Sequence, residues 1–139
     1  MEECTFCKIV KGEIPSFKIY EDEYTLAFPD INPVSEGHTL IVPKRHSENL
    51  FEIPTEDLTA VHRATQIVIH AIQDALNPIG VAVVQLNGRG VNQIIMHYHV
   101  HLIPRAANEP PLVVSDMGAK EADMDALKQI ADKIEAAIK

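Results

Sequence analysis

Three histidines at alternate positions, His97, His99 and His101, are the residues in this chain best placed to do chemistry. In an extended segment successive side chains point to opposite faces, so the three imidazoles would share one face. The apolar residues between them would then pack into a core on the other face. Because a buried polar ring needs a partner, this spacing favours a functional site over a packed interior.

Three kinds of chemistry fit this pattern. The imidazoles can bind one catalytic metal ion with an open position, or one of them can attack an electrophile while its neighbours bind the transferred group. In a mixed site one histidine serves a metal and another the reaction. Residues four apart on a strand lie about 13 Å apart at Cα, which disfavours one ion shared by all three.

Two cysteines near the N-terminus, Cys4 and Cys7, form a C-x-x-C half-site. Such a pair is half of a tetrahedral zinc site, but no second pair follows it in the sequence. Completion by two histidines from elsewhere would give a closed, structural site. Two free thiols or a redox couple are the alternatives.

Length and composition predict one domain over residues 1–139, with a core of about 4–105 and a helical tail of about 106–139. The chain is 46% hydrophobic and 23% charged, which is ordinary for a globular protein. No apolar run approaches the roughly 20 residues that span a bilayer, and the N-terminus lacks the pattern of a secretory signal. We therefore expect a cytoplasmic protein with reduced thiols and no membrane partner.

The formal net charge of −8 disfavours nucleic acid as a partner, because polyanion binding normally uses a basic surface. A small phosphorylated ligand needs only a local positive potential and remains compatible with this charge.

Five strands are expected from β-branched runs, period-two patterns and proline stops. They cover residues 17–20, 24–28, 37–43, 81–86 and 95–104, with a turn at 87–90. The strands do not alternate regularly with helices. This order predicts an α+β fold with an antiparallel sheet covered by helices.

A long amphipathic helix of about 20 residues is predicted to begin at Thr55, as its N-cap, and to end at Asn77-Pro78. Its apolar stripe recurs at steps of three and four: Leu58, Val61, Thr65, Val68, Ile72 and Ala75. A second amphipathic helix is expected from about Glu121 to the C-terminus.

Several segments together resemble the histidine-triad (HIT) family, in the branch of the Hint nucleotide hydrolases. The resemblance runs from about Cys4 to Arg105. The matching segments, in the family's order, are Phe6–Val10, Gly12–Pro15, Phe28–Pro33, Gly37–His46 and the triad His97–Ile103. It implies a five-stranded antiparallel sheet with a long central helix, usually paired as a homodimer.

The resemblance also implies the reaction. His99 matches the nucleophile that attacks the α-phosphorus of a nucleotide and forms a nucleotidyl-histidine intermediate, which water then hydrolyses. His101 matches a phosphate contact, and Gln93 would donate an amide hydrogen bond to the phosphate. A neutral imidazole attacks only through an unprotonated nitrogen, so we expect a backbone carbonyl to hold the other N–H of His99. No catalytic Mg²⁺ is expected.

Ligand sets follow from the same resemblance. The matches to a structural zinc site are Cys4, Cys7, His46 and His97. The matches to the pocket for a purine nucleotide or nucleotide conjugate are Phe6, Ile9, Phe28, Asp30, Ile31 and Leu40. Asn87 matches a phosphate or ribose contact, and the Asp30 carboxylate would accept both ribose hydroxyls. For the apolar members, plain core packing is an equally good interpretation.

One segment departs from the family pattern. Many relatives have Gly-Gln-Ser where this chain has Asn92-Gln93-Ile94, and Ile94 lacks the hydroxyl that would contact a leaving group. The leading hypothesis is a hydrolase of nucleoside phosphoramidates or related nucleoside monophosphate conjugates. The alternatives are a dinucleoside polyphosphate hydrolase, a nucleotide-binding adaptor with weak catalysis, and a metallohydrolase that uses all three histidines.

Overall fold

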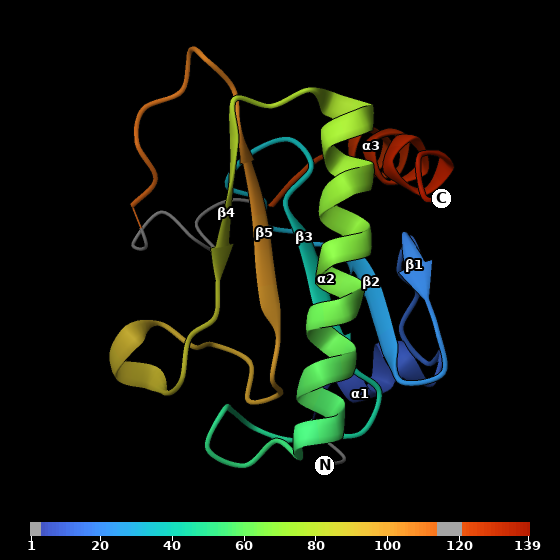
Figure 1. Ribbon diagram of the computed structural model, residues 1–139, viewed down its shortest axis with the longest axis vertical. Coiled ribbons are helices and arrows are strands. Elements are labelled where there is room, and N and C mark those ends of the chain that lie inside the picture. Colours follow the sequence, from blue (N-terminus) through green and yellow to red (C-terminus); the bar gives the residue numbers. More distant parts are fainter. Residues whose placement is uncertain (1–3, 114–120) are drawn as a thin grey trace.

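The computed structural model describes residues 4–113 and 121–139; residues 1–3 and 114–120, and with them the acidic start of the chain, lie outside the described residues. A five-stranded sheet and three α-helices make up the fold (Figure 1). The elements are α1 (Thr5–Val10), β1 (Tyr20–Glu21), β2 (Thr25–Pro29), β3 (Thr39–Pro43), α2 (Thr55–Leu76), β4 (Gly80–Val84), the 3-10 turn η1 (Arg89–Val91), β5 (Val100–Arg105) and α3 (Met124–Ala136).

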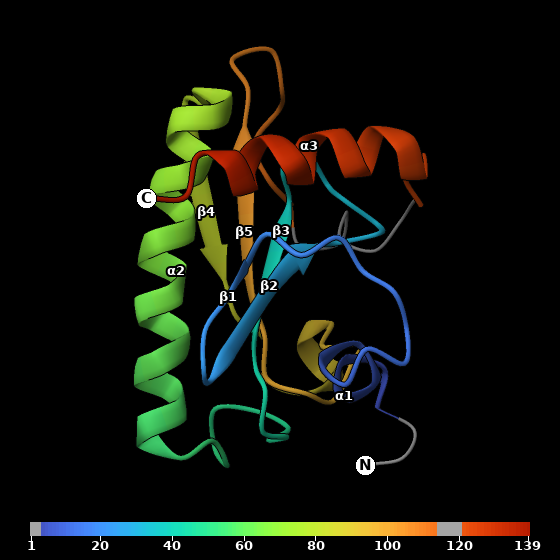
Figure 2. The same ribbon diagram turned by 90° about the vertical axis from the view of Figure 1, so that its right-hand side faces the viewer.

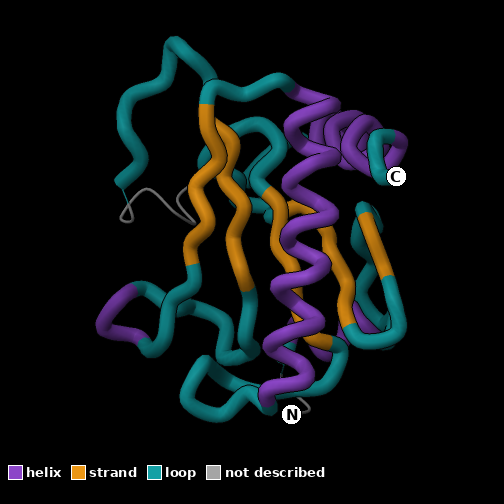
Figure 3. Tube along the Cα trace, in the orientation of Figure 1, coloured by secondary structure: helices purple, strands orange, loops and turns teal. Residues whose placement is uncertain are grey.

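All strand pairs are antiparallel, in the order β1-β2-β3-β5-β4. The predicted α+β fold, with a five-stranded antiparallel sheet, a long central helix and a C-terminal helix, is confirmed (Figure 3). Among the described residues no helix is both long and apolar enough to cross a bilayer.

Both faces of the sheet are covered (Figure 2). On one face, Ala27, Ile41 and Val100 pack with the buried stripe of α2. On the other, Phe28 and Leu40, which face each other across β2 and β3, pack with Phe6 of α1. Burial on both sides explains why every residue of β2 and β3 is buried.

The long helix α2 ends as predicted but begins differently. Asn77 adopts a left-handed conformation (φ 48°) and closes the helix, a conformation that Asn tolerates better than most residues. At the other end Pro54 occupies the N-cap position and Thr55 is already helical, without a side-chain cap. The prediction of Thr55 as the N-cap was wrong.

The last strand is shorter than predicted. β5 begins at Val100 instead of residue 95, so only His101 of the three histidines lies on a regular strand. β3 ends at Pro43, and its ladder with β5 covers only Thr39–Ile41. Beyond that ladder the Tyr98 N–H donates to the carbonyl of Ser47. The chain before β5 is therefore held by loop contacts.

Helix α1 was not predicted. Its six residues are too few for a periodic pattern, and its N-cap is a cysteine: Sγ of Cys4 accepts from the N–H of Cys7. The first strand is also displaced, at Tyr20–Glu21 instead of 17–20, and the predicted turn at 87–90 leads into η1.

Helix α3 crosses one end of the sheet (Figure 2). Its middle and end pack into the core beneath α2 through Ala131 and Ile134. Its first turn lies on the opposite side, capped by Asp123, whose carboxylate accepts from the N–H of Ala126. The helix therefore links the core on the α2 face with the face that carries the histidines.

Candidate active site

The alternating residues of segment 97–101 separate as expected. Tyr98 and Val100 are buried in the core on the α2 face. His97, His99 and His101 are buried on the α1 face, and each meets different neighbours. The shared face was predicted from an extended strand, and it holds although two of the three precede the ladder.

His99 has a defined tautomer. Its Nδ1 lies 2.7 Å from the carbonyl oxygen of His97, and a carbonyl can only accept, so Nδ1 carries the proton. Nε2 is therefore the unprotonated nitrogen. Burial lowers the pKa of His99 and keeps the ring neutral. The edge of Phe6 contacts the ring at a centroid distance of 5.1 Å, which adds to this shielding.

His101 belongs to a chain of hydrogen bonds that also fixes its tautomer. The N–H of Val34 donates to Nδ1 of His38 (3.0 Å), so the proton of neutral His38 is on Nε2. That nitrogen lies 2.9 Å from Nδ1 of His101 and donates to it. Nε2 of His101 is consequently an N–H donor.

The imidazoles in this series of hydrogen bonds, His38 and His101, are held in their neutral form. Burial lowers the pKa of His38 to about 4, with a smaller effect of His99. Burial, and then the charges of His99 and His38, lower the pKa of His101 to about 2. The carboxylate of Asp30 lies 3.4 Å from Nε2 of His38, and burial raises the pKa of Asp30. Protonation of the imidazoles therefore does not compete with ligand binding near neutral pH.

His97 faces sulfur instead. Its Nε2 donates to the carbonyl of Pro43 (2.8 Å), so its Nδ1 presents a lone pair. Nδ1 of His97 lies 3.3 Å from Sγ of Cys4 and 3.5 Å from Sγ of Cys7, while Nδ1 of His46 lies 3.4 Å from Sγ of Cys7. The four predicted metal ligands thus meet in one cluster.

This cluster fits a tetrahedral metal ion. With zinc–sulfur and zinc–nitrogen distances of about 2.3 and 2.05 Å, neighbouring S and N ligands lie about 3.6 Å apart, close to the spacing found. The N–H of His97 on a carbonyl is the outer-shell contact that metal-binding histidines typically make. Without a cation, burial and the adjacent Cys4 raise the pKa of Cys7 to about 11. The sulfur of Cys7 therefore needs a neighbouring positive charge to become a thiolate.

The described residues contain two groups with metal-ligand geometry, and neither joins the three triad histidines. The hypothesis of one ion bound by all three is therefore wrong. The second group is Asp30, His38 and His101. Because His38 accepts the Val34 N–H at Nδ1, its Nε2 holds a proton and is not available to a metal. This group is a hydrogen-bond chain.

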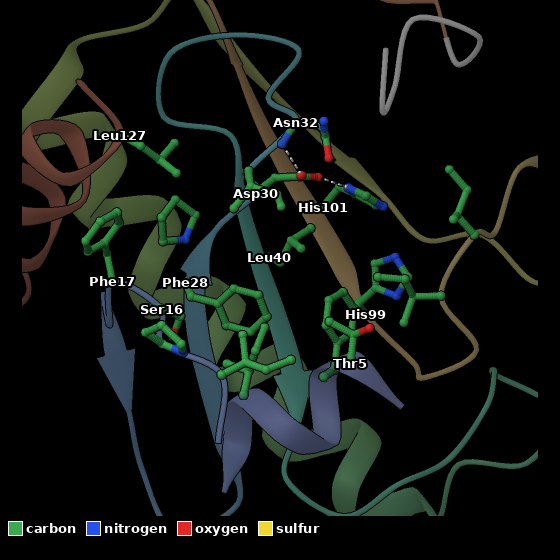
Figure 4. Close-up of a pocket in the computed structure, with 18 of the residues that line it drawn as sticks. Thr5, Ser16, Phe17, Phe28, Asp30, Asn32, Leu40, His99, His101 and Leu127 are labelled. Carbon is green, nitrogen blue, oxygen red and sulfur yellow. Dashed lines mark hydrogen bonds and ion pairs between the residues drawn. The ribbon is translucent and has the colours of Figure 1, made fainter. Parts of the chain in front are cut away.

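A cavity of about 580 Å³ opens in front of His99 and His101 (Figure 4). Its size is typical of pockets for small-molecule ligands. All six predicted nucleoside contacts line it: Phe6, Ile9, Phe28, Asp30, Ile31 and Leu40. Phe6, Phe28 and Leu40 also belong to the core on the α1 face. Core packing is thus confirmed for these three residues, and their contact with a nucleoside stays a prediction.

Two predicted contacts lie elsewhere. Neither Gln93 nor Asn87 is among the residues that line this cavity. The amide of Gln93 donates to the carbonyls of Glu48 (2.7 Å) and Ile95 (3.1 Å), so its hydrogens are used within the chain. The amide oxygen of Asn87 accepts from the N–H of Leu50 (2.8 Å). Both residues therefore brace loops. The phosphate contact of Gln93 and the phosphate or ribose contact of Asn87 stay predictions.

Three residues that lie at the site, His38, Met124 and Leu127, have no role predicted from the sequence. His38 shares a face with Leu40, which pairs directly with His101, so the two histidines are diagonal neighbours across β3 and β5. That contact could be predicted only once the pairing of β3 with β5 was known. Met124 and Leu127 of α3 also line the cavity.

The comparisons agree with this geometry. A family model described as the HIT domain matches residues 11–108. Together with the fold and the histidine face, this shows that the chain belongs to the HIT family of hydrolases. The prediction of an enzyme of the histidine-triad type is confirmed at this level.

Particular relatives are similar over most of the chain. "Protein hit" of Bacillus subtilis is 47% identical over 104 residues, which cover 75% of this chain and 72% of the relative. Adenosine 5′-monophosphoramidase HNT1 of Saccharomyces cerevisiae is 42% identical over 137 residues, covering 95% and 83%. A zinc-bound histidine triad family protein from Mycobacterium smegmatis has a TM-score of 0.86 at 30% identity, with coverage of 99% and 94%.

Proposed function

We propose that this chain hydrolyses nucleoside phosphoramidates and related nucleoside monophosphate conjugates, preferably of purines, through a nucleotidyl intermediate on Nε2 of His99. One observation carries the proposal: the bond from Nδ1 of His99 to the carbonyl of His97 leaves an unprotonated Nε2 at a ligand-sized cavity. The similarity to a yeast adenosine 5′-monophosphoramidase supports the same substrate class.

The two chemical steps follow from these tautomers. Nε2 of His99 attacks the α-phosphorus and forms a P–N bond, while the bond to the leaving amine breaks and the amine takes up one proton from water. Nε2–H of His101 is the donor for a phosphate oxygen. A water molecule then attacks phosphorus, the electron pair returns to Nε2, and the proton taken up in the first step is released.

The charge of the cavity favours a single phosphate. Among the described residues that line it there is no lysine or arginine, and Asp30 adds a carboxylate. A phosphoramidate monoester carries one negative charge, which imidazole and backbone N–H groups can match. A dinucleoside polyphosphate carries several and would be repelled more strongly by a chain of net charge −8.

Trapping the intermediate tests this function. Adenosine 5′-phosphoramidate is mixed with the protein and quenched within milliseconds, and peptide mass mapping should locate an adenylyl group on His99. The His99→Ala variant should show no adduct and no turnover, yet bind AMP. An adduct on another residue, or undiminished turnover of the variant, would contradict the mechanism. Comparison of kcat/KM with a dinucleoside polyphosphate separates the two substrate classes.

We further propose that Cys4, Cys7, His46 and His97 hold a structural zinc ion. Four protein ligands close the coordination shell, so bound zinc would supply rigidity and charge neutralisation for the two sulfurs. The donor distances and the outer-shell carbonyl of Pro43 support this ligand set, as does the similarity to a zinc-bound relative.

The predicted homodimer also has structural support. β4 is the outermost strand of the sheet, and its Val83 is exposed, as is Ile79 beside it. An unpaired edge with apolar side chains can pair with the same edge of a second copy about a two-fold axis. Light scattering should then report twice the chain mass. The cytoplasmic location and the lack of nucleic-acid binding stay predictions, the latter consistent with the acidic charge.

A further inference from the structure

The cavity continues beyond the residues matched to the nucleoside. Its far wall is made by the loop before β1 and by the first turn of α3, and the residues that line it are Ile14, Pro15, Ser16, Phe17, Met124 and Leu127. Figure 4 shows Ser16, Phe17 and Leu127 on the side of Phe28 away from His99. We call this part of the cavity the far compartment.

The part of the far compartment that α3 forms is anchored to the rest of the fold. The end of the helix is anchored in the core through Ala131 and Ile134, and just before the helix the N–H of Ala122 donates to the carbonyl of Ile31 (2.8 Å). Leu127 is 7% exposed. Because both ends of this segment are tied, the part of the far wall that α3 contributes belongs to the fold.

The direction of a bound nucleotide follows from the order of groups along the cavity. In the proposed mode of binding the phosphate lies at the His99 end, the ribose at Asp30 and the base beyond them, so the base edge farthest from the sugar would point into the far compartment. Ser16 is the only polar side chain among the six residues of that wall. The compartment can therefore recognise apolar surface and size, but offers little for hydrogen-bond reading of a base.

We infer that the far compartment binds an apolar substituent on the six-membered ring of the purine, so that the substrates of this chain include N6-alkyl or N6-aryl adenine nucleotide conjugates. The inference rests on the proposed function, because the orientation of the nucleotide comes from His99. It assigns to α3 a role in substrate selection: Met124 and Leu127 determine which base substituents fit.

Calorimetric binding of two product-like ligands, AMP and N6-benzyl-AMP, tests the inference in the full-length protein. Burial of the benzyl group should make N6-benzyl-AMP bind about tenfold or more tightly than AMP. Ser16→Phe, a change in an exposed loop residue, should fill the compartment and remove that advantage while AMP affinity changes less than twofold. Lys18→Phe, two residues further on and outside the cavity lining, is the matched control and should preserve the advantage.

The outcomes separate the two proposals. If wild type binds AMP but binds N6-benzyl-AMP more weakly, the far compartment is closed to substituents and the inference is overturned. If Ser16→Phe weakens both ligands equally, the compartment holds the base itself, which also overturns it. If AMP does not bind at all, the proposed nucleotide site is wrong. Thermal unfolding of both variants checks that each remains folded. Met124→Ala, which removes part of the apolar wall, should weaken the preference for N6-benzyl-AMP.

Discussion

The two ends of segment 97–101 carry the same residue type on the same face and have different tasks. At one end His97 presents a lone pair to two thiols and a second imidazole. At the other end His101 receives a hydrogen bond from His38 and keeps its own N–H for the cavity. Each imidazole is neutral and buried, so charge does not distinguish them.

The position of the proton distinguishes the two ends. A carbonyl at Nε2 of His97 places the lone pair on Nδ1, whereas a donor at Nδ1 of His101 places the proton on Nε2. A lone pair beside sulfur suits a metal, and an N–H at a cavity suits a phosphate oxygen. His99 lies between them, and its proton is held by the backbone carbonyl of His97. His97, a member of the Cys/His cluster, thus also positions the ring of His99, the proposed nucleophile.

Removal of a cluster ligand should have the largest effect, and on stability. Cys7→Ser replaces a buried sulfur of the proposed zinc site and should lower the free energy of unfolding by about 4 kcal/mol or more. Thermal unfolding measures the change. A strong chelator should lower the Tm of the wild type to that of the variant and leave the variant unchanged. An unchanged wild-type Tm after chelation would remove the structural role of the metal.

At the His101 end of the segment we expect a substitution to lower activity and to leave zinc binding unchanged. His101→Ala deletes the N–H donor at the cavity and should lower kcat about 10²- to 10³-fold, while zinc content stays at the wild-type value. Steady-state kinetics and metal analysis on the same preparation measure both. Loss of zinc in this variant would show that the two ends are not separable.

His38 should act through His101, and its effect should be smaller. His38→Leu removes the donor to Nδ1 of His101 and should lower kcat about 10- to 30-fold, because the His101 tautomer is no longer fixed. His38→Gln can place an amide N–H near the same point and should recover most of the loss. Equal defects in both variants would indicate a packing role for His38 instead.

Local sequence patterns predicted the neighbours of His97 better than the neighbours of His101. The shared face of the three histidines follows from period two, and the four residues of the proposed zinc site came from segments that resemble the HIT family. The His38–His101 contact depends on the register of β3 against β5, which places Leu40 opposite His101. The short helix α1 depends on a cysteine cap, which composition does not reveal.

The residues that line the cavity could also be predicted only in part from the sequence. Contacts near Phe28 and Asp30 lie in segments with recognisable patterns, whereas Leu127 reaches the cavity only because α3 crosses the end of the sheet. The phosphate contact of Gln93 is predicted from the resemblance alone, and the resemblance did not reveal that its amide donates to the carbonyls of Glu48 and Ile95. Side-chain partners fixed by distant loops cannot be read from local sequence.

The smallest expected effect concerns the departure from the family pattern at Ile94, which lines the cavity and is 68% exposed. Ile94→Ser would supply a hydroxyl at the cavity rim, where it can donate to the departing nitrogen. The variant should raise kcat/KM for adenosine 5′-phosphoramidate about three- to tenfold, the value of one modest hydrogen bond.

Ile94→Ala removes the same bulk without a hydroxyl and is the matched control. Equal gains in both variants would mean that the isoleucine acts through steric hindrance, and no gain in either would mean that leaving-group release does not depend on this position. Because Ile94 is exposed and is not a member of the Cys/His cluster, neither variant should change Tm or zinc content, so this pair tests the catalytic end of the comparison by itself.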